Sequence, residues 1–235
     1  MTSDNVDRSA VRNQPSNSLR KRIAAGQVWK TASGLIDSPL YPAGFELFRQ
    51  HSPPQVVYFS ESGLVKLMRS EDNGRELILS LKFSGSLVGA AAAIHDRPHP
   101  FSAITVGACR LARLSAHVFL DLVAADTQLA SCLHKMLSAE ILDQTARLSQ
   151  IACLPARHRL EQLLWQLASD EDGGDRCNLK FQLPLRYWEV AQLLVITPTY
   201  LSRLFRELEQ EKIISRNKGW FVIHEPARLW HEADG

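Results

Sequence analysis

Short apolar runs recur about every ten residues between positions 42 and 114 and alternate with polar turns. Two of them are QVVYF at 55–59 and LVKLM at 64–68. Turn signals separate such runs: Ser62-Gly63 follows the first run, and Asn73-Gly74 supplies the positive φ that tight hairpins need. Short strands at this spacing predict a β-rich barrel or sandwich in the first half of the chain.

After Ser115 the apolar period becomes helical. The pattern predicts a short helix over 116–123 and a long one from 127 to about 154, which contains neither proline nor glycine. Apolar positions in the long helix alternate steps of four and three, the seam of a two-stranded coiled coil with one polar member. We expect this seam to pair two copies of the chain, and the alternative is that it packs on its own barrel. The seam residues are Leu137, Ile141, Gln144, Leu148 and Ile151.

The last third of the chain predicts a compact mixed domain. Pro155 can start a helix over 156–169. After a polar loop come a strand at 181–183, helices at 185–194 and 197–210, and a hairpin over 213–223. The fold class is therefore α+β. We expect a flexible basic tail at 1–22, a β-barrel effector domain at 23–125, a dimerisation helix at 126–154 and a winged helix-turn-helix at 155–235.

Two of these helices carry the strongest functional signal. They are joined by about three residues, and Ala191 allows them to cross closely. The inward set is Val190, Leu194, Leu201, Leu204 and Leu208, and the outward set is Thr199, Tyr200, Ser202, Arg203 and Arg206. Hydroxyls bind phosphates or base edges and arginine forks onto guanine, so the outward face suits a DNA-recognition helix.

The flanks of this helix support the same interpretation. Thr197 is a plausible N-cap before Pro198, and its exposed amides favour a phosphate. On the hairpin, Arg216 and Lys218 are expected to touch the DNA backbone as a wing. Five basic and three acidic residues lie between 203 and 218, which is a small excess of positive charge for a DNA-binding segment. A winged domain that contacts protein, with its arginines solvated, is the alternative.

Composition narrows the remaining choices. The 235 residues carry a net charge of +2 and 45% hydrophobic residues, a globular balance in which nucleic-acid binding must be local. No apolar stretch approaches the ~20 residues of a membrane span, and the amino terminus does not resemble a secretory signal. Four cysteines without a CxxC pair fit reduced thiols, so we expect a cytoplasmic protein.

The order and spacing of several segments resemble the Crp/Fnr superfamily of bacterial transcription regulators. The carrying segments are YPAGFELFRQ at 41–50, VVYFSESGLVKLMRSEDNGRELIL at 56–79, ARLSQIACLPARHRLEQLLWQLA at 146–168 and LSRLFRELEQEKII at 201–214. The resemblance implies a double-stranded β-helix effector domain of the cyclic-nucleotide-binding jelly-roll type, a dimerising helix and a winged helix-turn-helix. It also implies a regulator that is not an enzyme, with double-stranded DNA, a second copy and RNA polymerase as partners.

Residue by residue, the resemblance assigns roles on the recognition helix. Ser202 and Arg203 match the family's serine–arginine pair, and Arg203 is the leading base reader. Thr199 stands where many members carry a glutamate that reads cytosine, so the usual half-site is not expected. Val195 occupies the place where glycine is common in a left-handed turn, which predicts either a different turn or strain.

The effector domain departs from the family's pattern for cyclic nucleotides. Members that bind them use a glycine–glutamate pair and an arginine–serine pair, where this chain has Gly89-Ala90 and Phe101-Ser102. A buried phosphate would lack its cation, so a cyclic nucleotide is disfavoured. An iron–sulfur cluster is disfavoured because no cysteine precedes Cys109.

Two questions about the barrel stay open. An effector pocket would be lined by Leu79, Val88, Gly89, Ala90, Ala91 and Ser102, and the alternative is a tight core with no ligand and a constitutive regulator. His95 and His99 could hold haem or a metal, but two loop histidines are weak evidence for such a site. A barrel that binds a metal or a small molecule as its main function is a further alternative.

Overall fold

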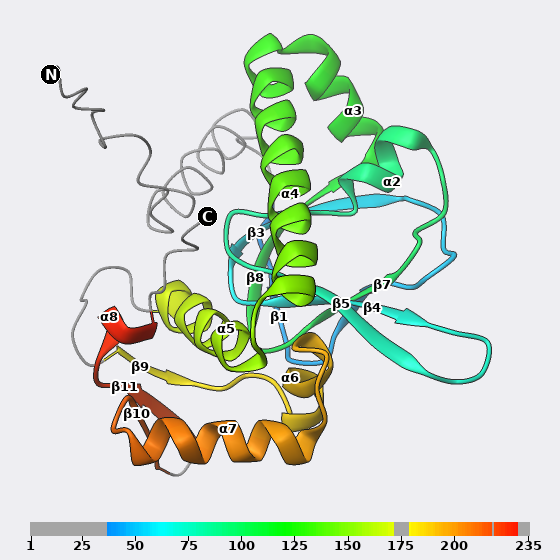
Figure 1. Cartoon of the computed structure of the whole chain (residues 1–235). Coiled ribbons are helices and arrows are strands. Elements are labelled where there is room, and N and C mark those ends of the chain that lie inside the picture. Colours follow the sequence, from blue (N-terminus) through cyan, green and yellow to red (C-terminus); the bar gives the residue numbers. More distant parts are fainter. Residues whose placement is uncertain (1–36, 172–178, 218, 230–235) are drawn as a thin grey trace, which may run out of the picture.

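The computed structural model describes residues 37–171, 179–217 and 219–229. The tail expected at 1–22 and Lys218 lie outside these residues. The α+β class is confirmed, with a β-domain, a long helix and a mixed C-terminal domain in that order. Figure 1 shows the long helix standing beside the β-domain and the C-terminal domain below both.

The β-domain consists of two four-stranded antiparallel sheets, in the orders β1-β8-β3-β6 and β2-β7-β4-β5. Both predicted turns are present, and Gly63 between β3 and β4 has a φ of +92°. A Cβ there would lie 2.7 Å from the carbonyl oxygen of Ala108, so only glycine fits. The strands are β1 (Leu40–Tyr41), β2 (Glu46–Phe48), β3 (Val56–Ser62), β4 (Val65–Ser70), β5 (Glu76–Lys82), β6 (Leu87–Val88), β7 (Ser102–Thr105) and β8 (Cys109–Ser115).

Three helices follow or interrupt the sheets: α2 (Ala90–His95), α3 (Ala116–Ala125) and α4 (Thr127–Cys153). The side chain of Asp126 caps α4 by accepting from the backbone N–H groups of Gln128 and Leu129. The amino-terminal part of α4 packs on α2 and α3 through buried Leu129 and Leu133. Past this contact α4 runs along the β-domain with most of its residues exposed.

The C-terminal domain surrounds a three-stranded sheet in the order β10-β11-β9. Its core is built from leucines, from the stacked rings of Phe181 and Phe221, and from Phe205, which packs against Phe221 at a tilt. The short elements β1, α2 and α8 were not predicted, whereas the long helix, the other helices of this domain and the hairpin agree with the expected pattern within a few residues. The elements are α5 (Ala156–Glu171), β9 (Leu179–Gln182), α6 (Tyr187–Leu193), α7 (Pro198–Gln210), β10 (Ile214–Asn217), β11 (Trp220–Ile223) and α8 (Pro226–Leu229).

The two domains share one apolar core. Met68 and Ile78 of the β-domain belong to the same buried cluster as the leucines of α5, α6 and α7. Helix α6 lies between β5 and α7, which leaves α7 at the lower edge of the molecule, away from the two sheets of the β-domain (Figure 1). The outward face of α7 is therefore not packed against its own barrel.

Candidate nucleic-acid interface

Helix α7 begins as its sequence predicts. The hydroxyl oxygen of Thr197 accepts a hydrogen bond of 3.2 Å from the backbone N–H of Tyr200, and Pro198 occupies the first turn. All five residues of the predicted inward face are buried. Phe205, which was not in that set, is also fully buried and packs between Tyr187 and Phe221. These contacts determine which side of α7 faces outward.

The turn before α7 is strained at one position. Val195 has a φ of +54°, a left-handed conformation that is rare for a β-branched residue. Its N–H bonds to the carbonyl of Gln192, and the N–H of Ile196 reaches back to Ala191 at 3.0 Å. This pair of bonds is the Schellman arrangement, which normally places glycine at the left-handed position. Of the two possibilities that the sequence left open, strain is the correct one.

The outward residues differ in exposure. Thr199, Arg203 and Arg206 are exposed, whereas Tyr200 and Ser202 are half-buried. Ser202 donates from its hydroxyl to the carbonyl of Pro198 at 3.0 Å, and its oxygen can still accept. The Tyr200 ring packs against the domain core and lies 4.6 Å from the guanidinium carbon of Arg203. Arg203 itself is 67% exposed.

Arg216 lies in a different setting from the expected wing contact. Its guanidinium forms two hydrogen bonds with Glu209, at 2.7 and 2.6 Å, and a third with the hydroxyl of Tyr187. It also stands 5.1 Å from the centre of the Phe205 ring. These bonds hold the pKa of Glu209 below its usual range and raise the pKa of Arg216. The side chain thus ties β10 to α7.

A sequence signal for this orientation exists. Side chains alternate between the two faces of a strand, so Arg216 shares its face with buried Ile214. In the antiparallel pairing Arg216 also stands opposite buried Phe221. Strand alternation in the hairpin therefore predicts that the Arg216 side chain is directed toward the core of its domain.

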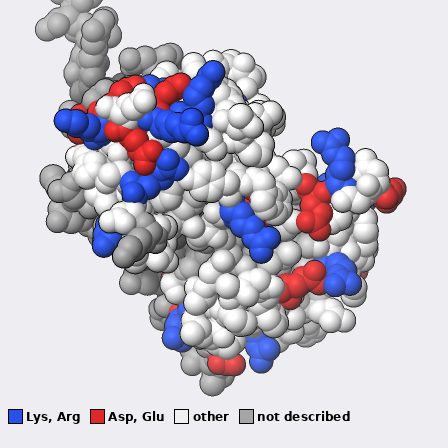
Figure 2. All heavy atoms as spheres, turned by 90° about the horizontal axis from the view of Figure 1, so that it is seen from below, with Lys and Arg blue, Asp and Glu red and all other residues white. Residues whose placement is uncertain are grey.

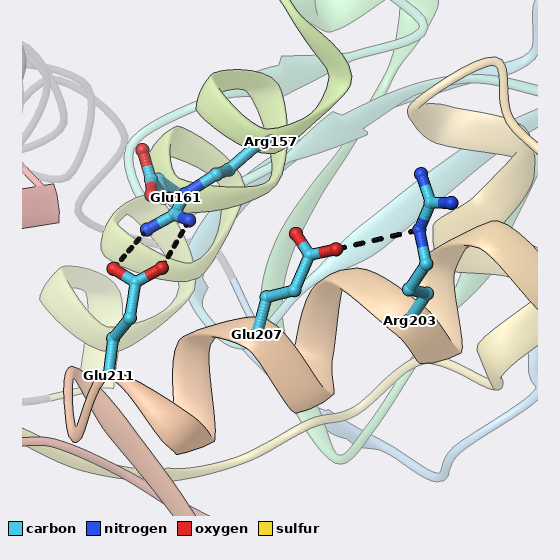
Figure 3. Close-up of polar contacts among 5 residues, drawn as sticks. All are labelled: Arg157, Glu161, Arg203, Glu207 and Glu211. Carbon is cyan, nitrogen blue, oxygen red and sulfur yellow. Dashed lines mark hydrogen bonds and ion pairs between the residues drawn. The ribbon is translucent and has the colours of Figure 1, made fainter.

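The three acidic residues of this segment are all engaged with arginines. Glu209 holds Arg216, Glu207 contacts Arg203, and Glu211 receives two hydrogen bonds of 2.6 and 2.7 Å from Arg157 on α5 (Figure 3). The Nε of Arg157 also binds the buried Glu161, and its contacts with both carboxylates raise its pKa. Each of the three acidic residues is therefore paired with an arginine.

The charge that remains free is small. Arg206 and Lys212 are exposed, and neither has an ion-pair partner within the described ranges. Figure 2, the view from below, shows basic side chains interspersed with acidic ones and no continuous basic patch. An interface of this kind depends on a few placed side chains more than on total charge.

Comparisons with known proteins identify this architecture. A family model for the cyclic nucleotide-binding domain matches residues 40–126, and one for the Crp-like helix-turn-helix domain matches residues 158–232. The chain belongs to the Crp/Fnr superfamily. It is accordingly a DNA-binding transcription regulator.

Individual relatives cover most of this Crp/Fnr chain. The cyclic AMP receptor protein of Thermus thermophilus is 27% identical over 196 residues, which span 83% of this chain and 88% of the relative. The CRP-like protein Clp of Xanthomonas axonopodis is 26% identical over 190 residues, 78% of this chain and 82% of the relative. The structure of FixK2 from Bradyrhizobium japonicum, 17% identical, superposes with a TM-score of 0.71 over 83% of this chain and 96% of that one, a likeness of fold.

The seam residues of this Crp/Fnr protein lie along α4 with unequal burial. Leu137 and Ile151 are half-buried, whereas Ile141 and Leu148 are 66% and 69% exposed and Gln144 is exposed with them. Together with α2, this part of α4 borders a mostly apolar groove of about 480 Å³. The groove is lined by Ala91, Ile94, His95, Leu137, Glu140, Ile141, Gln144, Thr145 and Leu148.

The expected effector pocket is only partly assembled. Val88, Ala90 and Ser102 are buried and Leu79 is half-buried, but Ala91 is exposed and faces the groove beside α4. A Cβ at Gly89 would lie 3.3 Å from Phe48 and 3.4 Å from His99, so these two rings occupy the space next to it. The hydroxyl oxygen of Ser102 accepts from the backbone N–H of Gln50 at 2.9 Å.

The two histidines are in different environments. His95 is exposed and lines the α4 groove, whereas His99 is 1% exposed and stacks on Phe48 with 3.6 Å between ring centres. Burial lowers the pKa of His99, and its Nδ1 has no hydrogen-bond partner among the described residues. The described residues contain no group of three His, Cys, Asp or Glu side chains that could hold a metal ion. None of the described helices is long and apolar enough to cross a membrane.

Proposed function

We propose that this regulator works as a homodimer that binds a specific two-part DNA site through Arg203 and its neighbours on α7. The observation that carries the proposal is the exposed face of α7, which is supported from behind by a buried apolar stripe and two arginine contacts. Arg203 is the base reader, and Arg206 and Lys212 are placed to meet phosphates. Thr199, Ser202 and the N-cap Thr197 are further contact candidates.

Two copies of α7 would enter successive major grooves of one duplex. Helix-turn-helix dimers place their recognition helices about one helical turn apart, so the two half-sites are expected roughly 10 bp from centre to centre. Thr199 cannot accept a hydrogen bond from cytosine as a carboxylate does, which supports a half-site different from that of glutamate-bearing members. Lys218 stays a candidate for a wing contact, while Arg216 supports α7.

The dimer contact is proposed on α4. Ile141 and Leu148 expose large apolar side chains, and burying them against a second α4 would contribute roughly 1.5–3 kcal/mol each. Gln144 lies between them at the one polar seam position, which in coiled coils favours one register. The groove between α2 and α4 offers the space that a partner helix needs.

We propose that the effector, if one binds, is not a cyclic nucleotide. Ala90 is buried where the binding members carry glutamate, and Phe101 packs beside Phe48 where they carry arginine. Lys82, a buried cation of β5, is paired with Glu140 of α4. The stack of His99 on Phe48 favours the second candidate, a constitutive regulator with a closed barrel. We place the protein in the cytoplasm, with RNA polymerase as the further partner that the family implies.

The test is selection of duplexes from a random pool by the full-length protein. We expect a site of ~25 bp with two related half-sites and steep salt dependence. Arg203→Ala should weaken binding by ~1–3 kcal/mol and relax preference at one base pair per half-site. Selection of no sequence, or unchanged binding by Arg203→Ala, would contradict the proposal.

The same preparation tests dimerisation and the effector. Leu148→Glu should yield a monomer by light scattering, whereas Ala146→Glu on the opposite face of α4 should leave the dimer intact. Added cyclic AMP or cyclic di-GMP should leave duplex affinity unchanged. A monomeric wild type, or an affinity that rises with either nucleotide, would refute the corresponding part of the proposal.

A further inference from the structure

Two side chains of its own helix hold Arg203. Its Nε lies 3.5 Å from a carboxylate oxygen of Glu207, one turn further along α7, and its guanidinium carbon lies 4.6 Å from the centre of the Tyr200 ring. Figure 3 shows Arg203 and Glu207 on the same side of α7, with the Nε of the arginine facing the carboxylate. The guanidinium therefore contacts the Tyr200 ring with its face and the Glu207 carboxylate with its Nε.

The tyrosine is a rigid platform for this arrangement. Its ring is half-buried and packs against the core of the winged domain. Its backbone N–H is fixed by the Thr197 cap. Arginine stacks well on aromatic faces, so a fixed ring limits the rotation of the guanidinium. Tyr200, expected from the sequence to touch DNA, has its ring face beside the guanidinium of Arg203.

The carboxylate leaves a defined part of Arg203 available. With Nε facing Glu207, the two terminal nitrogens, Nη1 and Nη2, have no hydrogen-bond partner in the part of the chain that the structure describes. A guanidinium that offers these two nitrogens can donate two parallel hydrogen bonds to O6 and N7 of guanine. Glu207 is half-buried and lies one helical turn from Arg203 on the same side of α7, so its carboxylate can act on the orientation of this arginine.

We propose that Glu207 is a positioning residue that sets the base preference of Arg203, with the Tyr200 ring as its second support. The proposal rests on DNA reading by Arg203. Glu207 orients the arginine so that Nη1 and Nη2 meet guanine, and it does not contact DNA itself. The opposing explanation is a solvated ion pair on an exposed helix, which stabilises α7 slightly and has no effect on base choice.

The experiment compares Glu207→Gln with Glu211→Gln in the full-length dimer. Both variants remove one negative charge from the same helix, but only the first faces Arg203. Each is tested at one salt concentration against the selected duplex and against duplexes changed at the base pair that Arg203→Ala relaxes. Equal circular dichroism and equal dimer size establish that the variants are folded.

We expect both variants to bind all duplexes somewhat more tightly, because a repelling charge is lost. Glu207→Gln alone should also reduce discrimination at the Arg203 base pair, by roughly two- to fivefold. In an Arg203→Ala background the same substitution should change discrimination no further. If Glu207→Gln raises affinity uniformly, as Glu211→Gln does, the positioning role is wrong while DNA reading by Arg203 stands. If Arg203→Ala itself leaves discrimination unchanged, the proposed function fails instead.

Discussion

At the scale of single residues, the most informative position is Val195 in the turn between α6 and α7. A left-handed conformation costs a residue with a Cβ roughly 1–2 kcal/mol, and the fold accepts this cost at φ +54°. Val195 is 61% exposed, so replacing it with glycine removes little buried apolar surface. The turn therefore contains strain that a single substitution can release.

Val195→Gly should raise the free energy of unfolding by about 1 kcal/mol, because relief of strain exceeds the added entropy of the unfolded chain. Urea denaturation at a fixed protomer concentration measures this change, since dimer stability depends on concentration. Val195→Ala is the matched control: it retains a Cβ and should gain little. A glycine variant with a lower urea midpoint than the wild type would show that the turn is not strained.

At the scale of elements, Arg157 joins the start of α5 to the end of α7. It donates to Glu211 at the C-terminus of α7 and to Glu161 one turn further along α5 (Figure 3). The carboxylate of Glu161 is almost fully buried, whereas Glu211 is exposed. One arginine thus connects a buried charge with the recognition helix.

This difference in burial predicts that Arg157→Met and Glu211→Gln lower the stability of the protein by different amounts. Arg157→Met should lower the free energy of unfolding by about 2 kcal/mol, because Glu161 loses a cation in a buried place. Glu211→Gln should lower it by less than about 1 kcal/mol, as for exposed ion pairs. Urea titrations of both variants test this order. In a Glu161→Gln background, Arg157→Met should lower the free energy of unfolding by less than it does in the wild type. If the loss is the same in both backgrounds, it comes from the contact of Arg157 with Glu211 and not from Glu161.

The elements show how far sequence patterns reach. The long helix, both helices of the DNA-binding motif and the hairpin follow from periodicity, because each has enough residues to show a period or an unambiguous turn. Helix α2 has only six residues, and its N-cap Gly89 has a left-handed conformation. The segment is therefore too short to show a helical period in the sequence. The helix α8, of four residues, escapes prediction for the same reason.

Side-chain partners could be predicted less well than elements. The exposure of Thr199, Arg203 and Arg206 follows from helical spacing, and so does the Glu207 neighbour of Arg203, four residues on. The bond from Arg157 to Glu211 spans 54 residues and depends on how α5 and α7 pack. Helical spacing gives no information about such contacts between elements.

At the scale of the whole molecule, α6 links the DNA-binding domain to the β-domain. Lys66 of β4 forms an ion pair with Glu189 of α6, and both side chains are largely buried. The side-chain amide of Gln192 accepts from the backbone N–H of Ile78 and donates to the carbonyl of Glu76, at 3.3 and 3.0 Å, so it pairs with β5 as a neighbouring strand would. The two domains are therefore joined by polar contacts as well as by the shared apolar core, and we expect them to unfold as one unit.

This coupling predicts how the molecule unfolds. The tryptophans that the structure describes, Trp165, Trp188 and Trp220, all lie in the C-terminal domain. In a background with Trp29→Phe and Trp230→Phe, tryptophan fluorescence therefore reports that domain, while far-ultraviolet circular dichroism reports both domains. The two urea transitions should coincide when the domains unfold together, which is a test of two-state behaviour.

Lys66→Met combined with Gln192→Ala removes the polar links but leaves each domain's own core in place. The fluorescence transition should then move to lower urea than the circular dichroism transition, because the C-terminal domain loses support that the β-domain had supplied. Arg69→Met is the control, since Arg69 also lies on β4 but pairs with exposed Glu71 of the same domain. If the transitions of the double variant still coincide, the shared apolar core alone couples the two domains, and the polar contacts of α6 are not needed for this coupling.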